Sequence, residues 1–300
     1  MYTIEKLEKQ DLHYLELTSS DGASKAQISL NQGGRLSHLV FEGIQVLADF
    51  DASTYENNYA SSIQFPFVNR IKDGKYTFNN SKYKLNCNEV DKNNALHGLV
   101  YNKTFVCTKK TLTLNYASVT LQYKDYGKHQ GFPFKFNIDL TYTLNKKGII
   151  VSVNIANKDK KTFPFSLGWH PYFYSKNLYN STLSFISDKK YVFDNQQIIS
   201  GKTDLNIEMP FQLKAEILDN CYPLKTNEID LLYLFLIVFF ATGPRRIIYF
   251  CSEARFFSPQ HEFFCENVLL FVLLEKTRFL VKDEFKKRSI WRFQRFDSVR

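Results

Sequence analysis

The chain has 300 residues, of which 44% are hydrophobic and 16% aromatic, and it carries a formal charge of +9. A chain this apolar can bury a large core, so global disorder is excluded. Its basic residues are scattered as pairs, such as Lys109–Lys110 and Lys189–Lys190, rather than gathered into a stripe. We therefore expect solvated turns, with neither a nucleic acid nor a membrane as partner.

Period-two alternation dominates the first two-thirds of the chain and predicts short strands. Turn residues separate them, at Gln32–Gly34 and Glu42–Gly43, and as β-hairpins at Lys72–Lys75 and Asn145–Gly148. Helical periodicity is nearly absent, so we expect an all-β fold, a sandwich or a barrel, built as a single domain over residues 1–300. The expected strands are 26–30, 36–40, 44–47, 105–109, 117–123, 134–144 and 149–155.

The last quarter, residues 226–300, is an atypical part of that domain. Leu231–Ala241 is an unbroken apolar run of eleven residues, too short to cross a bilayer as a helix and suited to a buried strand. Downstream, Glu275–Arg300 is basic and has few turn residues. Two interpretations stay open: a natural but divergent terminus, and a reading-frame error in the underlying gene model.

Cysteine usage and the start of the chain both indicate a cytoplasmic protein. The five cysteines are odd in number and form no C-x-x-C motif, so neither a disulfide framework nor a zinc ribbon is indicated. Reduced, buried thiols are expected instead. Met1–Lys6 has no basic n-region and no apolar h-region, so we expect no signal peptide.

The segment SLGWHPYF places His170 between Trp169 and Pro171, with Tyr172 and Phe173 behind it. A lone histidine is more often a core residue whose nitrogens are satisfied by the backbone. Here, however, the proline restricts His170 to extended backbone, and the flanking rings can hold the C–H face of a sugar. Because an imidazole exchanges a proton near neutral pH, the segment favours acid/base chemistry.

A second histidine, His97, stands before Gly98, a residue that permits an unusual turn or a close approach. Two histidines from separate strands that converge on one pocket are a common way to bracket a substrate oxygen. Metal binding is the competing use, but no third ligand has a recognisable spacing. We therefore expect no metal.

Two further polar residues have two interpretations each. Arg70, after the run FPFVN that ends in Asn69, either caps a strand at the surface or aims its donors at sugar hydroxyls. Asp219, in ILDNCY, either forms a turn or accepts hydrogen bonds from vicinal hydroxyls. Taken singly, these residues leave both alternatives open.

Together, these motifs resemble the ordered motifs of the aldose 1-epimerase (galactose mutarotase) family. Each motif is short, but their order and spacing make the set fairly specific, and the resemblance covers roughly residues 25–225. The motifs are GGRL (33–36), FPFVNRI (65–71), DGKY (73–76), LHG (96–98), GWHPYF (168–173) and LDNCY (218–222).

The resemblance implies a large antiparallel β-sandwich that binds a sugar. The sugar hydroxyls would be bound by Asn69, Arg70, His97 and Asp219, and His170 would act as general acid. The implied activity is that of an isomerase that interconverts the α and β anomers of an aldohexose without a cofactor. The alternatives are a non-catalytic carbohydrate-binding sandwich and an epimerase that acts on a phosphorylated sugar.

The general base is the residue for which this chain departs from the family pattern. The resemblance implies a glutamate near the C-terminus, usually followed by proline. Glu266 is the nearest match but lacks the proline, and Glu262 and Glu275 are alternatives. If the reading frame has changed, none of them is the base.

Overall fold

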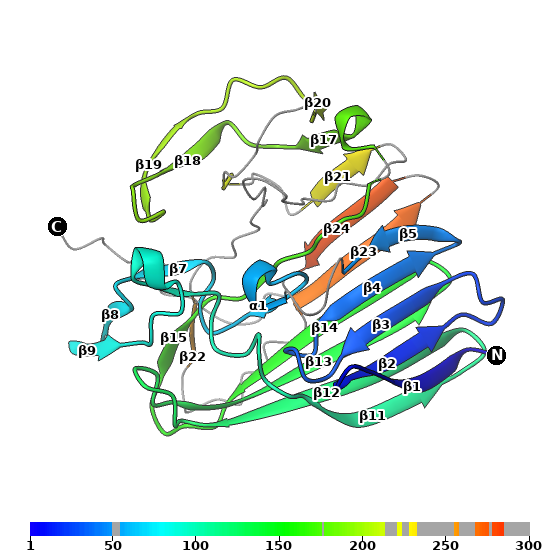
Figure 1. The fold of residues 1–300 in the computed structure, drawn as a ribbon, viewed down its shortest axis with the longest axis horizontal. Helices are drawn as coiled ribbons and strands as arrows, with labels where there is room; N and C mark the ends of the chain where they lie inside the picture. Colours follow the sequence, from blue (N-terminus) through cyan, green and yellow to red (C-terminus); the bar gives the residue numbers. More distant parts are fainter. Residues whose placement is uncertain are drawn as a thin grey trace.

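The computed structural model describes residues 1–49, 55–175, 177–213, 221–223, 228–232, 255–257, 268–275 and 278–284. Strands dominate these residues, and all named strand pairs among them are antiparallel (Figure 1). The expectation of an all-β antiparallel fold is therefore confirmed. The single-domain organisation stays a prediction.

The first sheet is a simple meander of five strands, in chain order, within the described residues. It carries the blue strands of Figure 1. Its strands are β1 (Thr3–Lys9), β2 (Leu12–Thr18), β3 (Lys25–Ser29), β4 (Leu36–Phe41) and β5 (Ile44–Leu47).

The second sheet has nine strands in the part of the chain that the structure describes, and it joins distant segments. In spatial order its strands are β11 (Val106–Leu112), β12 (Tyr116–Tyr126), β13 (Lys135–Asn145), β14 (Gly148–Asn157), β23 (Val268–Glu275), β24 (Arg278–Glu284), β21 (Glu228–Leu232), β17 (Thr182–Phe185) and β20 (Phe211–Gln212). Because β23 pairs with β14, the C-terminal part extends this sheet.

Short strand pairs complete the described fold, and β7, β8, β9, β18 and β19 lie on the left of Figure 1, away from the first sheet. The pairs are β6 (Ile63–Gln64) with β16 (Gly168–Trp169), β7 (Arg70–Lys72) with β10 (Asn94–Leu96), β8 (Lys75–Phe78) with β9 (Ser81–Lys84), β15 (Phe163–Phe165) with β22 (Arg255–Phe257), and β18 (Lys189–Phe193) with β19 (Ile199–Asp204). The helical turns are α1 (Tyr55–Asn58), η2 (Val90–Lys92) and η3 (Leu178–Asn180).

The long central strands form because their side chains alternate between two environments. Along β13, alternate residues from Phe136 to Leu144 are buried, while the intervening residues face outward. On the outer face, Thr141 meets Thr120 of β12 with 3.0 Å between their hydroxyl oxygens. A slip of one residue would exchange the two faces, so the burial pattern and the polar pairs fix the same register.

The hairpin expected at Asn145–Gly148 is present between β13 and β14, where these two residues face each other. The side chain of Asn145 accepts a hydrogen bond from the backbone N–H of Lys147 at 2.7 Å, which stabilises the turn. At Lys72–Lys75 the structure has a turn, in which the N–H of Gly74 donates to the carbonyl of Ile71 at 3.0 Å. The expected β-hairpin is wrong there, because β7 pairs with β10 and β8 pairs with β9.

The two sheets pack face to face over one hydrophobic core. Residues from both sheets belong to a single buried cluster, including Leu17 and Ile28 of the first sheet and Leu140 of the second. The hydroxyl of Tyr142 also donates to the carbonyl of Gly34 at 2.7 Å, which joins β13 to the glycine turn before β4. This glycine turn is therefore pinned to the core.

The expectation of buried cysteines is wrong for two of the three cysteines that the structure describes. The three described cysteines are free thiols, but only Cys221 is buried, whereas Cys87 and Cys107 are partly exposed. Cys87 lies in the irregular segment that follows β9, and Cys107 lies near the start of β11, so neither thiol is packed from all sides. Among the described residues, no helix is long and apolar enough to cross a membrane.

Candidate active site

His97 and His170 lie together although they are far apart in the sequence. His97 directly follows β10, and His170 directly follows β16. Their ring centroids are 5.0 Å apart, at an interplanar angle of 66°. Their exposed fractions are 2% and 1%. The meeting of two imidazoles expected from the sequence is therefore observed, while their chemical roles stay predictions.

Backbone hydrogen bonds fix the position of His170. Its N–H donates to the carbonyl of Ser62 at 3.0 Å, and its carbonyl accepts from the N–H of Ser61 at 2.7 Å. This exchange continues the short pairing of β16 with β6, in which Trp169 faces Ile63. The imidazole is thus carried on backbone that is held from both sides.

His97 is held by a strained backbone that needs a glycine beside it. Its φ is +64°, in the left-handed region, and its N–H donates to the carbonyl of Asn69 at 2.9 Å. Gly98 has a φ of +80°, and a Cβ there would lie 2.4 Å from the carbonyl oxygen of Phe65. Only glycine permits this close backbone approach.

The aromatic residues around the pair differ from the sequence expectation. Trp169 and Phe173 were expected to offer faces to a sugar, but they are 8% and 7% exposed and belong to the hydrophobic core. Both rings pack in the interior of the sugar-free protein, and their contact with a sugar stays a prediction. Tyr172 lies beside His170, with centroids 5.4 Å apart. Tyr59, which the sequence did not indicate, contacts His97 edge-on at 4.7 Å.

Burial sets the protonation state of His170. Removal from water lowers the pKa of its imidazole from 6.5 to about 4, because the charged form loses its hydration. The ring is therefore neutral at pH 7 in the sugar-free protein. The near-neutral pKa expected from the sequence does not hold in this environment.

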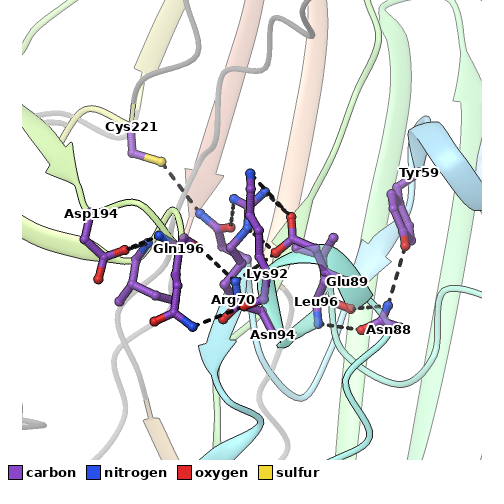
Figure 2. A network of polar contacts seen from close by, with 12 residues as sticks. Tyr59, Arg70, Asn88, Glu89, Lys92, Asn94, Leu96, Asp194, Gln196 and Cys221 are labelled. Carbon is purple, nitrogen blue, oxygen red and sulfur yellow. Dashed lines mark hydrogen bonds and ion pairs between the residues drawn. The ribbon is translucent and has the colours of Figure 1, made fainter.

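A second group of polar residues surrounds Arg70 (Figure 2). The Nε and Nη2 atoms of Arg70 each donate to a carboxylate oxygen of Glu89 at 2.8 Å. Nη1 donates to the side-chain oxygen of Asn69 at 3.1 Å. Two parallel hydrogen bonds to one carboxylate fix the plane of the guanidinium and the direction of its remaining N–H groups.

Glu89 is ionised through a balance of opposing effects. Burial raises the pKa of its carboxyl, but hydrogen bonds from Arg70 and Asn94 and the charges of Arg70 and Lys92 outweigh it, so the pKa lies below 4.5. The Asn94 side chain donates to it at 2.9 Å. Glu89 was not among the residues expected from the sequence, because a lone acid between two motifs has no diagnostic spacing.

Asn69 connects the two groups. Its backbone carbonyl binds His97, and its side-chain oxygen binds Arg70. Its side-chain nitrogen lies 4.0 Å from the sulfur of Cys221. Asn69, which was expected to bind sugar, is thus also a structural link between the backbone of His97 and the guanidinium of Arg70, and its φ is +59°.

The turn between β18 and β19 reaches the same region (Figure 2). The carbonyl of Gln196 accepts from the side chain of Asn94 at 2.8 Å, and the Gln196 side chain donates to the carbonyl of Lys92 at 3.2 Å. An ion pair joins Lys72 of β7 to Asp194 at 3.3 Å. This turn therefore supports the loop that carries Glu89.

The remaining expected site residues do not join this group in the part of the chain that the structure describes. Asp219 and Glu266 lie outside the described residues, as does Glu262, and Glu275 is described only as the end of β23. Among the described residues, no group of three or more His, Cys, Asp or Glu side chains has the arrangement of a metal site.

The geometry defines a class of protein first: an all-β antiparallel sandwich with a buried histidine pair next to a carboxylate-fixed arginine. The family model described as aldose 1-epimerase matches residues 15–252. The chain therefore belongs to the aldose 1-epimerase family.

Two curated relatives match about half of this chain. The uncharacterized proteins YihR and YphB of Escherichia coli K12 are 28% and 24% identical over 141 and 156 residues. These matches cover 47% and 52% of this chain and 44% and 51% of the relatives, so the chain spans about half the length of the curated relatives it matches.

Solved structures share the fold. A galactose mutarotase-like protein from Clostridium acetobutylicum has a TM-score of 0.61 at 22% identity, over 68% of this chain and 65% of that chain. A galactose 1-epimerase from Lactobacillus acidophilus also has a TM-score of 0.61, at 16% identity, over 80% and 82% of the two chains. The expected galactose mutarotase-like sandwich is thereby confirmed.

Proposed function

We propose that the chain is an aldose 1-epimerase that interconverts the α and β anomers of an aldohexose. The observation that carries this proposal is the contact between the His97 and His170 rings, at 5.0 Å, beside an arginine whose outer donors suit sugar hydroxyls. Family membership supports the same class of reaction.

The reaction needs two proton transfers and no change in composition. A base removes the proton of the anomeric hydroxyl while an acid protonates the ring oxygen, so the C1–O5 bond breaks and C1 becomes an aldehyde carbon. Rotation about C1–C2 presents the other face, and ring closure reverses both transfers. Each catalytic group contributes about 10²–10⁴-fold, and the sugar's own hemiacetal is the reactive group, so the proposal requires no cofactor.

We assign His170 the role of the acid at the ring oxygen. Hydroxyl binding falls to His97, Asn69 and Arg70, together with Asp219. The guanidinium suits this because its planar fork of donors is already oriented by Glu89 before the sugar arrives. Binding then requires little reordering of the side chain.

Glu266 is the proposed base, with Glu262 and Glu275 as alternatives. A carboxylate brought beside His170 would raise the pKa of its imidazole above the value of about 4 that burial imposes. The base would thus serve twice, by accepting the anomeric proton and by keeping the acid protonated.

The second candidate function is sugar binding without catalysis. The low pKa of His170 favours it, because a ring that stays neutral has no readily donated proton at pH 7. The two functions differ in one measurable property, which is whether the protein increases the rate at which the anomers of the sugar interconvert.

Polarimetry with freshly dissolved α-galactose or α-glucose tests the proposal. His170→Asn should slow interconversion by about 10²-fold or more. The matched control is His38→Asn, the same substitution in β4 of the first sheet, which should retain the parent rate. Unchanged turnover in a folded His170→Asn protein would remove His170 from the mechanism. Sugar binding by a parent protein that does not accelerate interconversion would favour the second candidate.

The base is tested by comparing Glu266→Gln with Glu262→Gln and Glu275→Gln. We expect only the first to slow interconversion by about 10²-fold or more. If none of the three variants is slower than the parent, the assignment of the base to this region is wrong.

Two finer points belong to the same proposal. The free thiols of the described cysteines fit a reducing compartment, and we propose the cytoplasm.

Running the polarimetry with hexose 6-phosphates beside the free hexoses distinguishes a phosphorylated substrate from a neutral one.

A further inference from the structure

Arg35 is a fully buried arginine outside the proposed site. It is 0% exposed and stands between the Gly33–Gly34 turn and β4. Its Nε and Nη2 atoms donate to the side-chain oxygen of Gln32 at 3.1 and 2.6 Å, and Nη2 also forms an ion pair with Asp49. A buried charge is unfavourable unless it is paired and hydrogen-bonded, and Gln32 and Asp49 satisfy both conditions for the guanidinium of Arg35.

The fourth polar contact of Arg35 leads toward the histidines. Its Nη1 donates to the backbone carbonyl of Ala60 at 3.1 Å. Ala60 lies between Tyr59 and Ser61, whose φ angles are +55° and +57°. Non-glycine residues keep such left-handed backbone only where surrounding contacts impose it, and a charge-assisted hydrogen bond at the residue between them supplies such a contact.

The residues on either side of Ala60 are the ones that touch the histidine pair. The Tyr59 ring lies edge-on against the His97 ring at 4.7 Å. Ser61 and Ser62 exchange backbone hydrogen bonds with His170, at 2.7 and 3.0 Å. One four-residue segment, 59–62, therefore contacts both imidazole-bearing residues, and Arg35 holds its middle.

We propose that Arg35 is a positioning residue for the His97–His170 pair, acting through segment 59–62. It acts on the histidines only through that segment. It orients the Tyr59 ring and the peptide groups of Ser61 and Ser62, and these set the spacing of the two imidazoles. The inference deepens the proposed function and rests on it for its effect on turnover.

The geometry requires an arginine at this position. The guanidinium donates in separate directions, to Gln32, Asp49 and Ala60, while its Cζ atom lies 4.2 Å from the centroid of the Tyr55 ring. A lysine ammonium is a point charge that cannot fill this fork and stack on the ring at once. Arg35→Lys therefore keeps the charge and loses the positioning.

The test measures turnover and the state of the imidazoles in the same variants. Arg35→Lys should lower kcat by about 10- to 100-fold while KM stays within about threefold, because misplaced catalytic groups affect chemistry more than binding. In NMR spectra of imidazole-labelled protein, the ring signals of both His97 and His170 should shift. Val119→Ala, a buried truncation in β12, is the control for lost stability and should leave kcat and both ring signals at the parent values.

Asp49→Asn serves as a second variant where Arg35→Lys does not fold. It weakens the anchor of the guanidinium and should shift the same ring signals with a smaller loss of kcat. Variants that lower the melting temperature yet leave the ring signals of the pair unchanged would overturn the proposal. The ring signals report on Arg35 even if the parent protein does not interconvert anomers, so failure of the proposed function would be seen separately.

Discussion

The histidine pair and the Arg70–Glu89 pair occupy neighbouring parts of the candidate site but are held in place by different kinds of interaction. Backbone hydrogen bonds, ring edges and a buried, neutral imidazole position the histidines. A charged, bidentate ion pair with Glu89 and the side-chain oxygen of Asn69 position Arg70. Asn69 touches both regions.

In the function we propose, the difference separates two tasks. Proton transfer needs a group whose charge can change, and burial makes the charge of His170 sensitive to what enters the site. Recognition of hydroxyls needs donors whose charge and direction do not change, and a guanidinium fixed by a carboxylate provides them. Perturbing one region should therefore change protonation or folding, and perturbing the other should change binding.

The largest expected effect is a loss of fold stability from a steric clash in the backbone beside His97. Gly98→Ala should destabilise the fold by about 4 kcal/mol or more, because the new Cβ would lie 2.4 Å from a backbone oxygen of Phe65. Chemical denaturation measures the loss. Gly22→Ala is the control, since Gly22 has a similar φ of +74° with no atom within 4 Å of the added Cβ, and it should cost about 1 kcal/mol. Equal losses would mean that the close approach beside His97 is not a constraint.

The next effect is a loss of stability in acid that originates at the histidines. Because the pKa of the His170 imidazole is 6.5 when it is fully hydrated, as in the unfolded chain, and about 4 in the fold, the unfolded state binds its proton first. The contribution is complete above pH 6.5 and is lost as the pH falls toward 4, about 3 kcal/mol in all. Unfolding free energies measured between pH 7 and pH 4 should show it.

His170→Asn should flatten that pH dependence, whereas His13→Asn, at an exposed histidine of β2, should not. Burial also lowers the pKa of His38, which adds a smaller loss in the same range. The pair Arg70–Glu89 follows a different window: the pKa of Glu89 is depressed, so its contribution is present above pH 4.5 and disappears only below it. A parent and a His170→Asn protein with the same pH profile would contradict the first window.

A smaller effect is expected on binding at the arginine. Glu89→Gln keeps the shape of the side chain but removes its charge and one acceptor oxygen from the pair with Arg70. We expect KM for the sugar to rise about tenfold with kcat within about threefold, because the guanidinium loses its fixed plane. Glu16→Gln, which removes the ion pair with Lys25 in the first sheet, should leave both constants unchanged. A fall in kcat without a change in KM would place Glu89 in the chemistry instead.

The smallest effect concerns the turn between β18 and β19. Lys72→Gln removes the exposed ion pair with Asp194, and the melting temperature should stay within about 2 °C of the parent. The hydrogen bond from Asn94 to the carbonyl of Gln196 would still hold the turn. A larger drop would show that the charge, and not the amide contact, attaches the turn to the site.

The parts predicted from the sequence are those that depend on local pattern. Alternation along residues 134–144 and the turn residues Asn145–Gly148 specify a hairpin before any tertiary contact forms. The restriction that Pro171 places on His170 is also local. The convergence of His170 with His97 followed from the order of the motifs, which reflects the family's fold.

The parts that were missed depend on tertiary packing. Glu89 reaches Arg70 only after β7 and β10 pair, and Tyr59 reaches His97 only after segment 59–62 is folded back. An aromatic ring beside a histidine can face a substrate or the core, and the tertiary packing places Trp169 in the core. The spacing of residues along the sequence does not indicate these contacts or this burial.

Asn69 has one more consequence, for how mutational energies combine. Since the same residue binds the main chain of His97 and the side chain of Arg70, a displacement of either partner is transmitted to the other. Substitutions in the two regions should then give non-additive free energies in a double-mutant cycle, with a coupling of about 0.5–3 kcal/mol that vanishes when Asn69 is first replaced by alanine. A sugar that displaces the guanidinium of Arg70 would in this way shift His97 through Asn69 alone.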